Sequence, residues 1–357
     1  MHIPTEAIGS IPRPAYLIEA YSKFHNREIS AVELDTLAKQ ATIETIHKLE
    51  AIGCEIITDG EQRKFNSFAG YCLHCAENIS PDGIRIDFSD GHYRTLPTLN
   101  AGPFRYQYTA DQFLAFAQAN SKALVKQAVI SPSLISLIYP IQGLPDYSRT
   151  QFIQDLLQQH TAEIRKCLDL SAHKVQIDFT EARLSLKLDP SGELLQNMVD
   201  LINSALSAFT DEERHRIGIH TCPGSDNDAS HSADVDYKYL LPTLFTINVG
   251  NFYIAMAGEK DPISALRLIQ SCLRPGIRVF IGVIDPISPE IESPELVCER
   301  VLQAAKYIPV DQLGICDDCG FAPFADDVST SREVVFSKIK SRLIGVRLAE
   351  EKLAELG

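Results

Sequence analysis

Short apolar runs alternate along the chain with longer segments in which apolar residues recur at helical spacing. Eight runs with the character of strands begin near residues 3, 55, 126, 174, 216, 251, 278 and 312. The segments between them predict helices at 31–52, 150–170, 191–209, 260–273 and 294–305, and a last helix is predicted at about 331–353. Eight strands separated mainly by helices predict an α/β fold, the (β/α)8 or TIM barrel, rather than an open doubly wound sheet. We expect a single domain over residues 1–357.

The segment at about 62–120, after the second strand, interrupts this alternation. Residues 84–88 and 92–96 each alternate apolar and polar side chains, and Asp90 and Gly91 form a turn sequence between them. This pattern is typical of a β-hairpin. We therefore predict a hairpin-containing insertion between the second and third units of the barrel.

Composition and charge exclude several classes of protein. A net charge of −14 disfavours nucleic acid and anionic membranes as partners. The longest apolar runs are far shorter than the ~20 residues of a membrane span, and the first residues lack the pattern of a signal peptide. Nine cysteines, an odd number scattered along the chain, fit reduced thiols in the cytoplasm better than a disulfide framework. The thiols are then free to bind metal.

A His-x-Cys pair ends the fifth predicted strand. Side chains two residues apart on a strand share a face, so His220 and Cys222 point the same way. Imidazole nitrogen and thiolate sulfur are zinc ligands, and a zinc site needs a third and usually a fourth ligand from elsewhere. Cys319 and Glu259 are the downstream candidates. The alternative is a core histidine beside a cysteine that packs as a small hydrophobic residue.

Two Cys-x-x-Cys pairs offer a different metal site. Cys72 with Cys75 and Cys316 with Cys319 would supply four thiolates to a structural zinc. A thioredoxin-like redox role for the second pair is disfavoured, because the two aspartates between its thiols oppose a low thiol pKa.

Other polar residues also follow predicted strands. Ser10 follows the first strand, Asp59 and Glu61 follow the second, and Asp178 and Glu181 follow the fourth. In a TIM barrel the carboxyl ends of the strands meet at one mouth, where active sites lie. The barrel therefore predicts that these residues converge with the His-x-Cys pair. For the two acidic residues after the second strand, the alternative is ordinary turn chemistry around the glycine between them.

Five short motifs together resemble the catalytic C-terminal barrel of cobalamin-independent methionine synthase. Each motif alone is weak, but the set is specific, and its order and spacing run through nearly all 357 residues. The resemblance implies transfer of a methyl group to a zinc-bound thiolate such as that of homocysteine. The motifs are Ile8-Gly-Ser10, Asp59-Gly-Glu61, Gln176-Ile-Asp178, Ile219-His-Thr-Cys222 and Asp318-Cys319-Gly320.

The resemblance implies a Zn2+ ion as the cofactor and also implies which residues bind it. His220, Cys222 and Cys319 hold the ion, together with a carboxylate from the region of the sixth strand. We assign the carboxylate to Glu259, because Asn248, which superficially matches that strand, offers only an amide. The alternative for Glu259 is a carboxylate favoured by the dipole in the first turn of a helix.

The resemblance also implies the substrate contacts. Asp178 and Glu61 receive the ammonium group of the amino-acid thiol, and paired carboxylates suit such a group. The backbone around Ile8 and Ser10 holds the substrate carboxylate. Glu181 is a departure from the family, which has a proline soon after the aspartate of the fourth strand, and we expect it to add negative charge close to the substrate.

Two further residues are candidates for catalysis. His231, in the polar loop after the fifth strand, is a candidate proton carrier near the metal, with a solvated loop histidine as the alternative. Asp318 is a candidate for binding a basic group of the substrate, with the capping of a turn as the alternative.

The chain also departs from the family pattern, which leaves the methyl donor open between a folate and a protein-borne group. It has no tryptophan to stack on a pterin, and the family's second, N-terminal barrel-like domain has no counterpart here. Two other functions stay open. One is a zinc-dependent transferase for another thiol or for an epoxide-like electrophile, as in epoxyalkane coenzyme M transferases, and the other is a non-catalytic zinc-binding or thiol-binding protein. The expected partners are a small thiol, the methyl donor and, in a homo-oligomer, a second copy of the chain.

Overall fold

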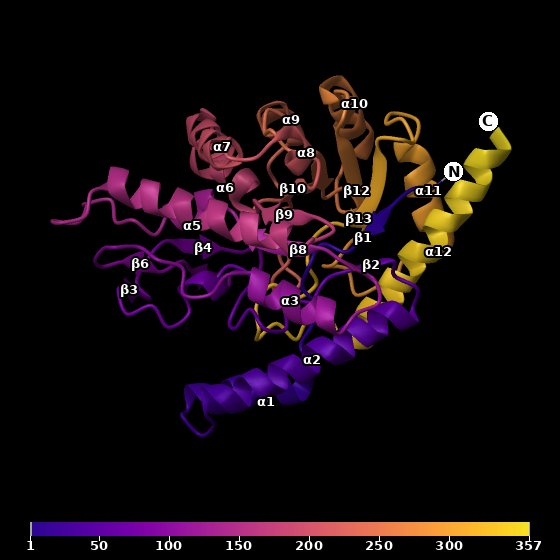
Figure 1. The fold of residues 1–357 in the computed structure, drawn as a ribbon. Coiled ribbons are helices and arrows are strands. Elements are labelled where there is room, and N and C mark those ends of the chain that lie inside the picture. The colour runs from indigo at the N-terminus through magenta and orange to yellow at the C-terminus, as the bar shows by residue number, and fades with distance from the viewer. Residues whose placement is uncertain (1, 357) are drawn as a thin grey trace.

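The computed structural model describes residues 2–356, so residues 1 and 357 of the expected domain lie outside it. Within this range, seven parallel strands form the central sheet in the order β1-β13-β12-β11-β10-β9-β8 (Figure 1). The strands are buried on both faces, which is why they read in the sequence as continuous apolar runs. Their bounds are β1 Thr5–Glu6, β8 Gln127–Ile130, β9 Val175–Asp178, β10 Ile217–Thr221, β11 Asn251–Ile254, β12 Arg278–Ile284 and β13 Leu313–Asp317.

A shorter pairing completes the circle of strands. β2 (Ile56–Ile57) runs parallel to β7 (Leu124–Val125), which leads directly into β8. On the other side of β2, the Thr58 hydroxyl donates a hydrogen bond to the Gly9 carbonyl at 2.8 Å, just beyond β1. All eight predicted strands are therefore present, and the prediction of a TIM-barrel-like α/β fold is confirmed.

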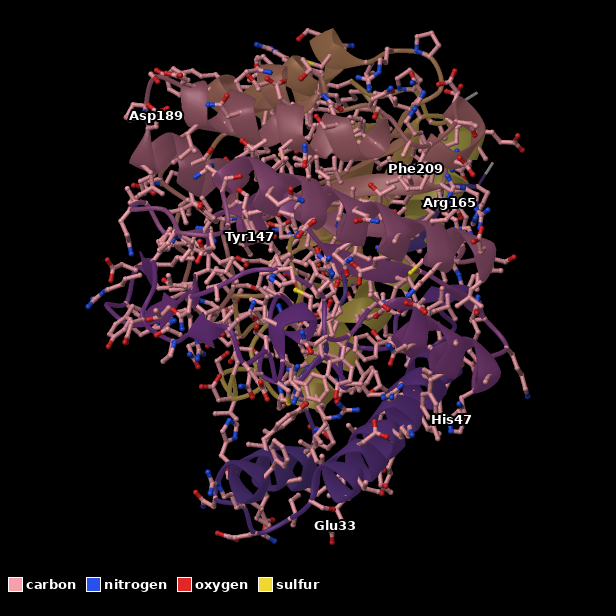
Figure 2. The ribbon with its side chains drawn as sticks, turned by 60° about the vertical axis from the view of Figure 1, so that its left-hand side comes forward. Glu33, His47, Tyr147, Arg165, Asp189 and Phe209 are labelled. Carbon is pink, nitrogen blue, oxygen red and sulfur yellow. The ribbon has the colours of Figure 1, made fainter. Side chains whose placement is uncertain are left out.

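Helices cover the outside of the sheet, and all six predicted helices occur within a few residues of their expected bounds. In Figure 1, α1 and α2 lie together below the sheet, and α12 runs along its edge beside α11. The Arg165 guanidinium lies 4.7 Å from the ring of Phe209, which is buried (Figure 2). The predicted helices are α2 Ala31–Ala51, α5 Arg149–Asp169, α7 Glu193–Leu206, α10 Pro262–Cys272, α11 Pro294–Ala304 and α12 Arg332–Leu356; those not predicted are α1 Ala15–His25, α3 Asp111–Ala119, α4 Pro132–Ser136, α6 Glu181–Leu188, α8 Asp211–Arg214 and α9 Tyr237–Leu244.

The segment after β2 contains the predicted hairpin. β4 (Arg85–Asp87) pairs antiparallel with β5 (Tyr93–Thr95), as the alternation around the Asp-Gly turn predicts. A second antiparallel pair joins β3 (Ile79–Ser80) to β6 (Thr98–Leu99), and a 3-10 turn, η1, spans Tyr71–Leu73. None of the helices in residues 2–356 is both long and apolar enough to span a membrane.

Candidate active site and metal centre

One histidine and two cysteines meet at the carboxyl ends of β10 and β13. His220 lies on β10, Cys222 follows that strand, and Cys319 follows β13. One potential ligand atom from each residue lies within 4.8 Å of the other two, and all three side chains are buried. The two Sγ atoms are 2.6 Å apart. The structure therefore brings together three of the four predicted metal ligands.

The surroundings of this cluster favour a thiolate. A hydrogen bond from the Cys222 thiol lowers the pKa of Cys319 well below its usual range, and the neighbouring His220 ring adds to the effect. Burial raises the pKa of Cys222. Neither ring nitrogen of His220 has a hydrogen-bond partner among the described residues, although the ring is buried. The buried His220 imidazole, which has no hydrogen-bond partner within residues 2–356, lies beside the Cys319 thiol, whose pKa is lowered. This donor set suits zinc.

The fourth predicted ligand lies outside the cluster. Oε1 of Glu259 is 2.5 Å from Nη1 of Arg183, with which it forms an ion pair. The side chain that packs against the two sulfurs from the end of β11 is Ala255, which offers no ligand atom. Glu259 as a zinc ligand therefore stays a prediction from the sequence.

Asp318 is bound by backbone N–H groups of the protein. Its carboxylate accepts hydrogen bonds from the backbone N–H groups of Met256, Ala257 and Gly258 at 2.7, 2.8 and 2.9 Å. These bonds fasten the loop after β11 to the end of β13. Burial raises the pKa of Asp318 to about 7, although the three N–H groups oppose that shift. Asp318 is not among the residues that line the cavity described below, and its role toward the substrate stays a prediction from the sequence.

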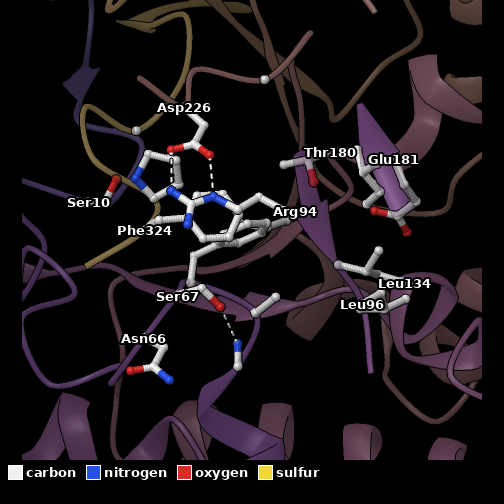
Figure 3. Close-up of a pocket in the computed structure, with 18 of the residues that line it drawn as sticks. Ser10, Asn66, Ser67, Arg94, Leu96, Leu134, Thr180, Glu181, Asp226 and Phe324 are labelled. Carbon is white, nitrogen blue, oxygen red and sulfur yellow. Dashed lines mark hydrogen bonds and ion pairs between the residues drawn. The ribbon is translucent and has the colours of Figure 1, made fainter. Parts of the chain in front are cut away.

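A cavity of about 370 Å³ opens beside the cluster (Figure 3). Phenylalanine and leucine side chains, including Phe324, Leu96 and Leu134, form its apolar wall. Every predicted substrate-binding residue lines this cavity, and so do three metal-ligand candidates and His231. These residues are Ile8, Ser10, Glu61, Asp178, Glu181, His220, Cys222, His231 and Cys319.

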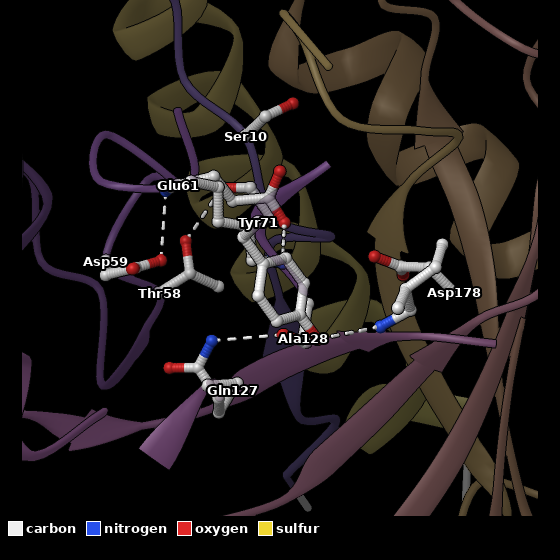
Figure 4. Close-up of polar contacts among 12 residues, drawn as sticks. Ser10, Thr58, Asp59, Glu61, Tyr71, Gln127, Ala128 and Asp178 are labelled. Carbon is white, nitrogen blue, oxygen red and sulfur yellow. Dashed lines mark hydrogen bonds and ion pairs between the residues drawn. The ribbon is translucent and has the colours of Figure 1, made fainter. Parts of the chain in front are cut away.

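Glu61 and Asp178 both line the cavity, and Figure 4 shows their side chains. Asp178 Oδ1 accepts a hydrogen bond from Gln176 Nε2 at 2.7 Å. Burial, reinforced by the neighbouring Glu61, raises the pKa of Asp178 to about 6. The Glu61 backbone N–H donates to Asp59 Oδ1 at 2.9 Å, and Glu61 has a positive φ of 59°. In this motif Asp59 stabilises the turn, and Glu61 lines the cavity.

Glu181 and His231 are both buried at the cavity. Hydroxyl groups of Ser131 and Ser133 each donate to Glu181 Oε1 at 2.6 Å, and burial raises its pKa to about 7. Burial lowers the pKa of His231 to about 4, and its ring stands edge-on to Phe88. His231 is therefore neutral near pH 7 and is not the solvated loop histidine considered as its alternative.

Arg94 was not anticipated from the sequence. Arg94 lies on the hairpin strand β5 (Figure 3). Its Nε and Nη2 donate to Asp226, and its Nη1 and Nη2 donate to Asp326. The guanidinium lies 4.1 Å from the Phe324 ring. The hairpin was predicted, but its partners lie about 130 and 230 residues away in the chain. The arginine fastens the insertion over the cavity.

The four cysteines of the two Cys-x-x-Cys pairs do not form a common site. Cys316 packs against Tyr253 and Phe280 inside the barrel, whereas the Cys72 thiol donates to a backbone carbonyl within the insertion. All nine cysteines are free thiols in the described part of the chain.

Comparison with known proteins identifies the family. Residues 3–332 match the family described as cobalamin-independent synthase, catalytic domain. The chain belongs to this family. The resemblance predicted from the five motifs is therefore confirmed.

Relatives within the family align over the full length. A methionine synthase of Sulfurisphaera tokodaii is 22% identical over 99% of this chain and 95% of its own length. The protein YxjH of Bacillus subtilis is 22% identical over 93% of this chain and 91% of its own. The fold matches the structure of a B12-independent methionine synthase from a Shewanella species in complex with selenomethionine, with a TM-score of 0.79 and 19% identity over 99% of this chain and all of that one.

Proposed function

We propose that this family member is a zinc-dependent methyltransferase that methylates the thiol of an amino acid such as homocysteine. The observation that carries the proposal is the meeting of two kinds of group on one cavity. The His220, Cys222 and Cys319 cluster can hold a metal, and the carboxylates of Glu61 and Asp178 can hold an ammonium group. An amino-acid thiol carries both complementary groups.

The three-residue cluster fits zinc in its chemistry. His220, Cys222 and Cys319 would hold the ion, because two sulfurs and one imidazole are its preferred donors. Zinc bound there would supply a Lewis acid that keeps an entering thiol deprotonated at neutral pH. Catalytic zinc sites commonly have three protein ligands and an exchangeable fourth position. The cluster lines the cavity, so that position would be open to the substrate sulfur.

The rest of the cavity would orient the substrate and exclude water. Glu61 and Asp178 would bind the substrate ammonium, and the backbone at Ser10 would receive its carboxylate. The phenylalanines of the wall, Phe65 and Phe324 among them, keep water from the reacting sulfur and offer an apolar surface to the methyl donor. A folate and a protein-borne group are the two candidate methyl donors.

X-ray absorption at the zinc edge, with and without homocysteine, tests the site first. We expect one more sulfur neighbour at the metal after the thiol is added. Zinc that does not respond to homocysteine would overturn the choice of this thiol, and protein purified without stoichiometric zinc would overturn the metal site. Product formation with methyltetrahydrofolate, as the monoglutamate and the triglutamate, then tests transfer. No methylated thiol with these donors or a protein-borne one would favour a binding function.

A further inference from the structure

A fully buried lysine lies directly behind the carboxylates at the cavity. The Lys64 side chain is 0% exposed, and its Nζ donates to Glu61 Oε1 at 2.9 Å. The backbone forms a tight turn here, because the Lys64 N–H donates to the Glu61 carbonyl. Lys64 is not among the residues that line the cavity, whereas Glu61 is. The ammonium of Lys64 therefore contacts Glu61 from the protein side.

Several anions and one ring face this lysine. Glu61, Asp178 and Asp59 are the negative charges that act on it, and all three are buried. The Tyr71 ring, from the insertion, lies 5.2 Å from Nζ (Figure 4). Among the described residues, neither Asp59 nor Asp178 forms an ion pair. In the described part of the chain, Lys64 is the one cation that forms an ion pair with any of these three buried carboxylates, so a further positive charge at the cavity would be favoured.

Each cavity carboxylate has one oxygen held by the protein and one left over. Lys64 holds Oε1 of Glu61, and Gln176 holds Oδ1 of Asp178. Within residues 2–356, Oε2 of Glu61 and Oδ2 of Asp178 form no hydrogen bond, yet neither is sealed from solvent. These two oxygens are therefore free to accept hydrogen bonds from a ligand in the cavity. An ammonium group offers three donors and the missing positive charge.

We propose that Lys64 is a specificity-determining residue, which holds Glu61 so that the site accepts thiols carrying an α-ammonium group. This inference rests on the proposed function and deepens it. Without Lys64, the Glu61 carboxylate would be buried with no counter-ion, so it would take up a proton or turn away. In either case the pocket loses one acceptor for the substrate ammonium. A thiol that lacks the ammonium group does not use this acceptor.

Two thiols that differ only in the amino group test the proposal. L-Homocysteine and 4-mercaptobutanoate have the same chain, thiol and carboxylate. The assay follows each thiol by its charge-transfer band in Co2+-substituted protein, which reports binding without turnover. We expect Lys64→Met to raise the Kd of homocysteine about 30-fold and to change the Kd of 4-mercaptobutanoate less than about twofold. Lys64→Arg, which keeps the charge, should restore most of the affinity for homocysteine.

Lys338→Met is the matched control. Lys338 is also fully buried, and its Nζ lies 3.0 Å from Glu292 Oε2, but neither residue lines the cavity. This variant should leave both Kd values unchanged. Equal weakening of both thiols by Lys64→Met, with Co2+ retained, would overturn the proposal and leave Lys64 a structural counter-ion. If Lys64→Met does not fold, Lys64→Gln decides, because it also removes the charge. An unchanged preference for homocysteine in Lys64→Gln, beside a selective loss in Glu61→Gln, would exclude Lys64. Wild-type protein that binds neither thiol would instead refute the proposed function.

Discussion

Glu259→Gln separates a structural role from a metal-binding role for this carboxylate. The Arg183 side chain that pairs with Glu259 is only 1% exposed, and that of Glu259 is 18% exposed. Arg183 also donates to the Val235 carbonyl and lies 4.4 Å from the Tyr237 ring. Replacing the carboxylate with an amide would leave a buried guanidinium with no counter-ion.

The size of the effect follows from burial. Removing one partner of a buried ion pair costs about 3–5 kcal/mol, because the other charge stays buried and uncompensated. Glu259 is partly exposed and Arg183 keeps two other contacts, so we expect a loss of about 3 kcal/mol, at the low end of that range. This loss should appear in metal-free protein, since it does not depend on zinc.

Urea unfolding with a chelator, combined with zinc analysis of the loaded protein, distinguishes the two roles. We expect Glu259→Gln to lower the free energy of unfolding by about 3 kcal/mol and to retain one zinc per chain. Glu299→Gln, at an exposed position on α11, is the matched control and should change neither quantity. Loss of zinc together with unchanged metal-free stability would refute this reasoning and restore Glu259 as the fourth ligand.

Three further predictions follow from the cavity and the core. Cys222→Ser and Cys319→Ser should each abolish stoichiometric zinc without changing the circular dichroism, and a full zinc equivalent in either variant would exclude the site. Gly9→Ala should raise the KM for homocysteine about tenfold and spare the metal, because a Cβ there would lie 2.7 Å from Oε1 of Glu61; an unchanged KM would contradict this. Burial raises the pKa of Glu163 from 4.5 to about 7, so its contribution to stability is complete below pH 4.5 and is lost as the pH rises through 7. Between pH 4.5 and 8, wild-type protein should therefore lose about 3 kcal/mol more stability than Glu163→Gln in urea titrations, and parallel curves would show that the residue is not buried as described.

The strands of the barrel could be predicted because parallel strands buried on both faces produce continuous apolar runs. Apart from α1, the helices that were not predicted have nine residues or fewer, and one of them carries a contrary signal. This helix, α9, contains Pro242, which in isolation indicates a helix end. Its helical conformation comes from packing of Leu240 and Leu241 in the core, a tertiary effect that local spacing does not reveal.

The convergence of the site could be predicted as soon as the barrel was assigned. Ser10 and Cys319 are more than 300 residues apart, yet both line the cavity, because the carboxyl ends of β1 and β13 are neighbours in the sheet. Contacts between loops could not be predicted in this way. Arg94 meets Asp226 through the docking of an insertion, and no periodic pattern encodes that docking.

Two ion pairs, Lys64 with Glu61 and Arg183 with Glu259, show where prediction from the sequence ends. The family resemblance assigns Glu259 to the metal, because the alternative, Asn248, offers only an amide. In the structure Oε1 of Glu259 accepts a hydrogen bond from Arg183, which is 76 residues away in the chain. Lys64, in contrast, is three residues from Glu61, within one turn. A carboxylate predicted to line a buried site needs a counter-ion or a ligand, and a lysine at that spacing can reach it. The sequence therefore contained the signal for Lys64, since charge balance at a buried turn is a local property, whereas the partner of Glu259 depends on how two separate βα units pack.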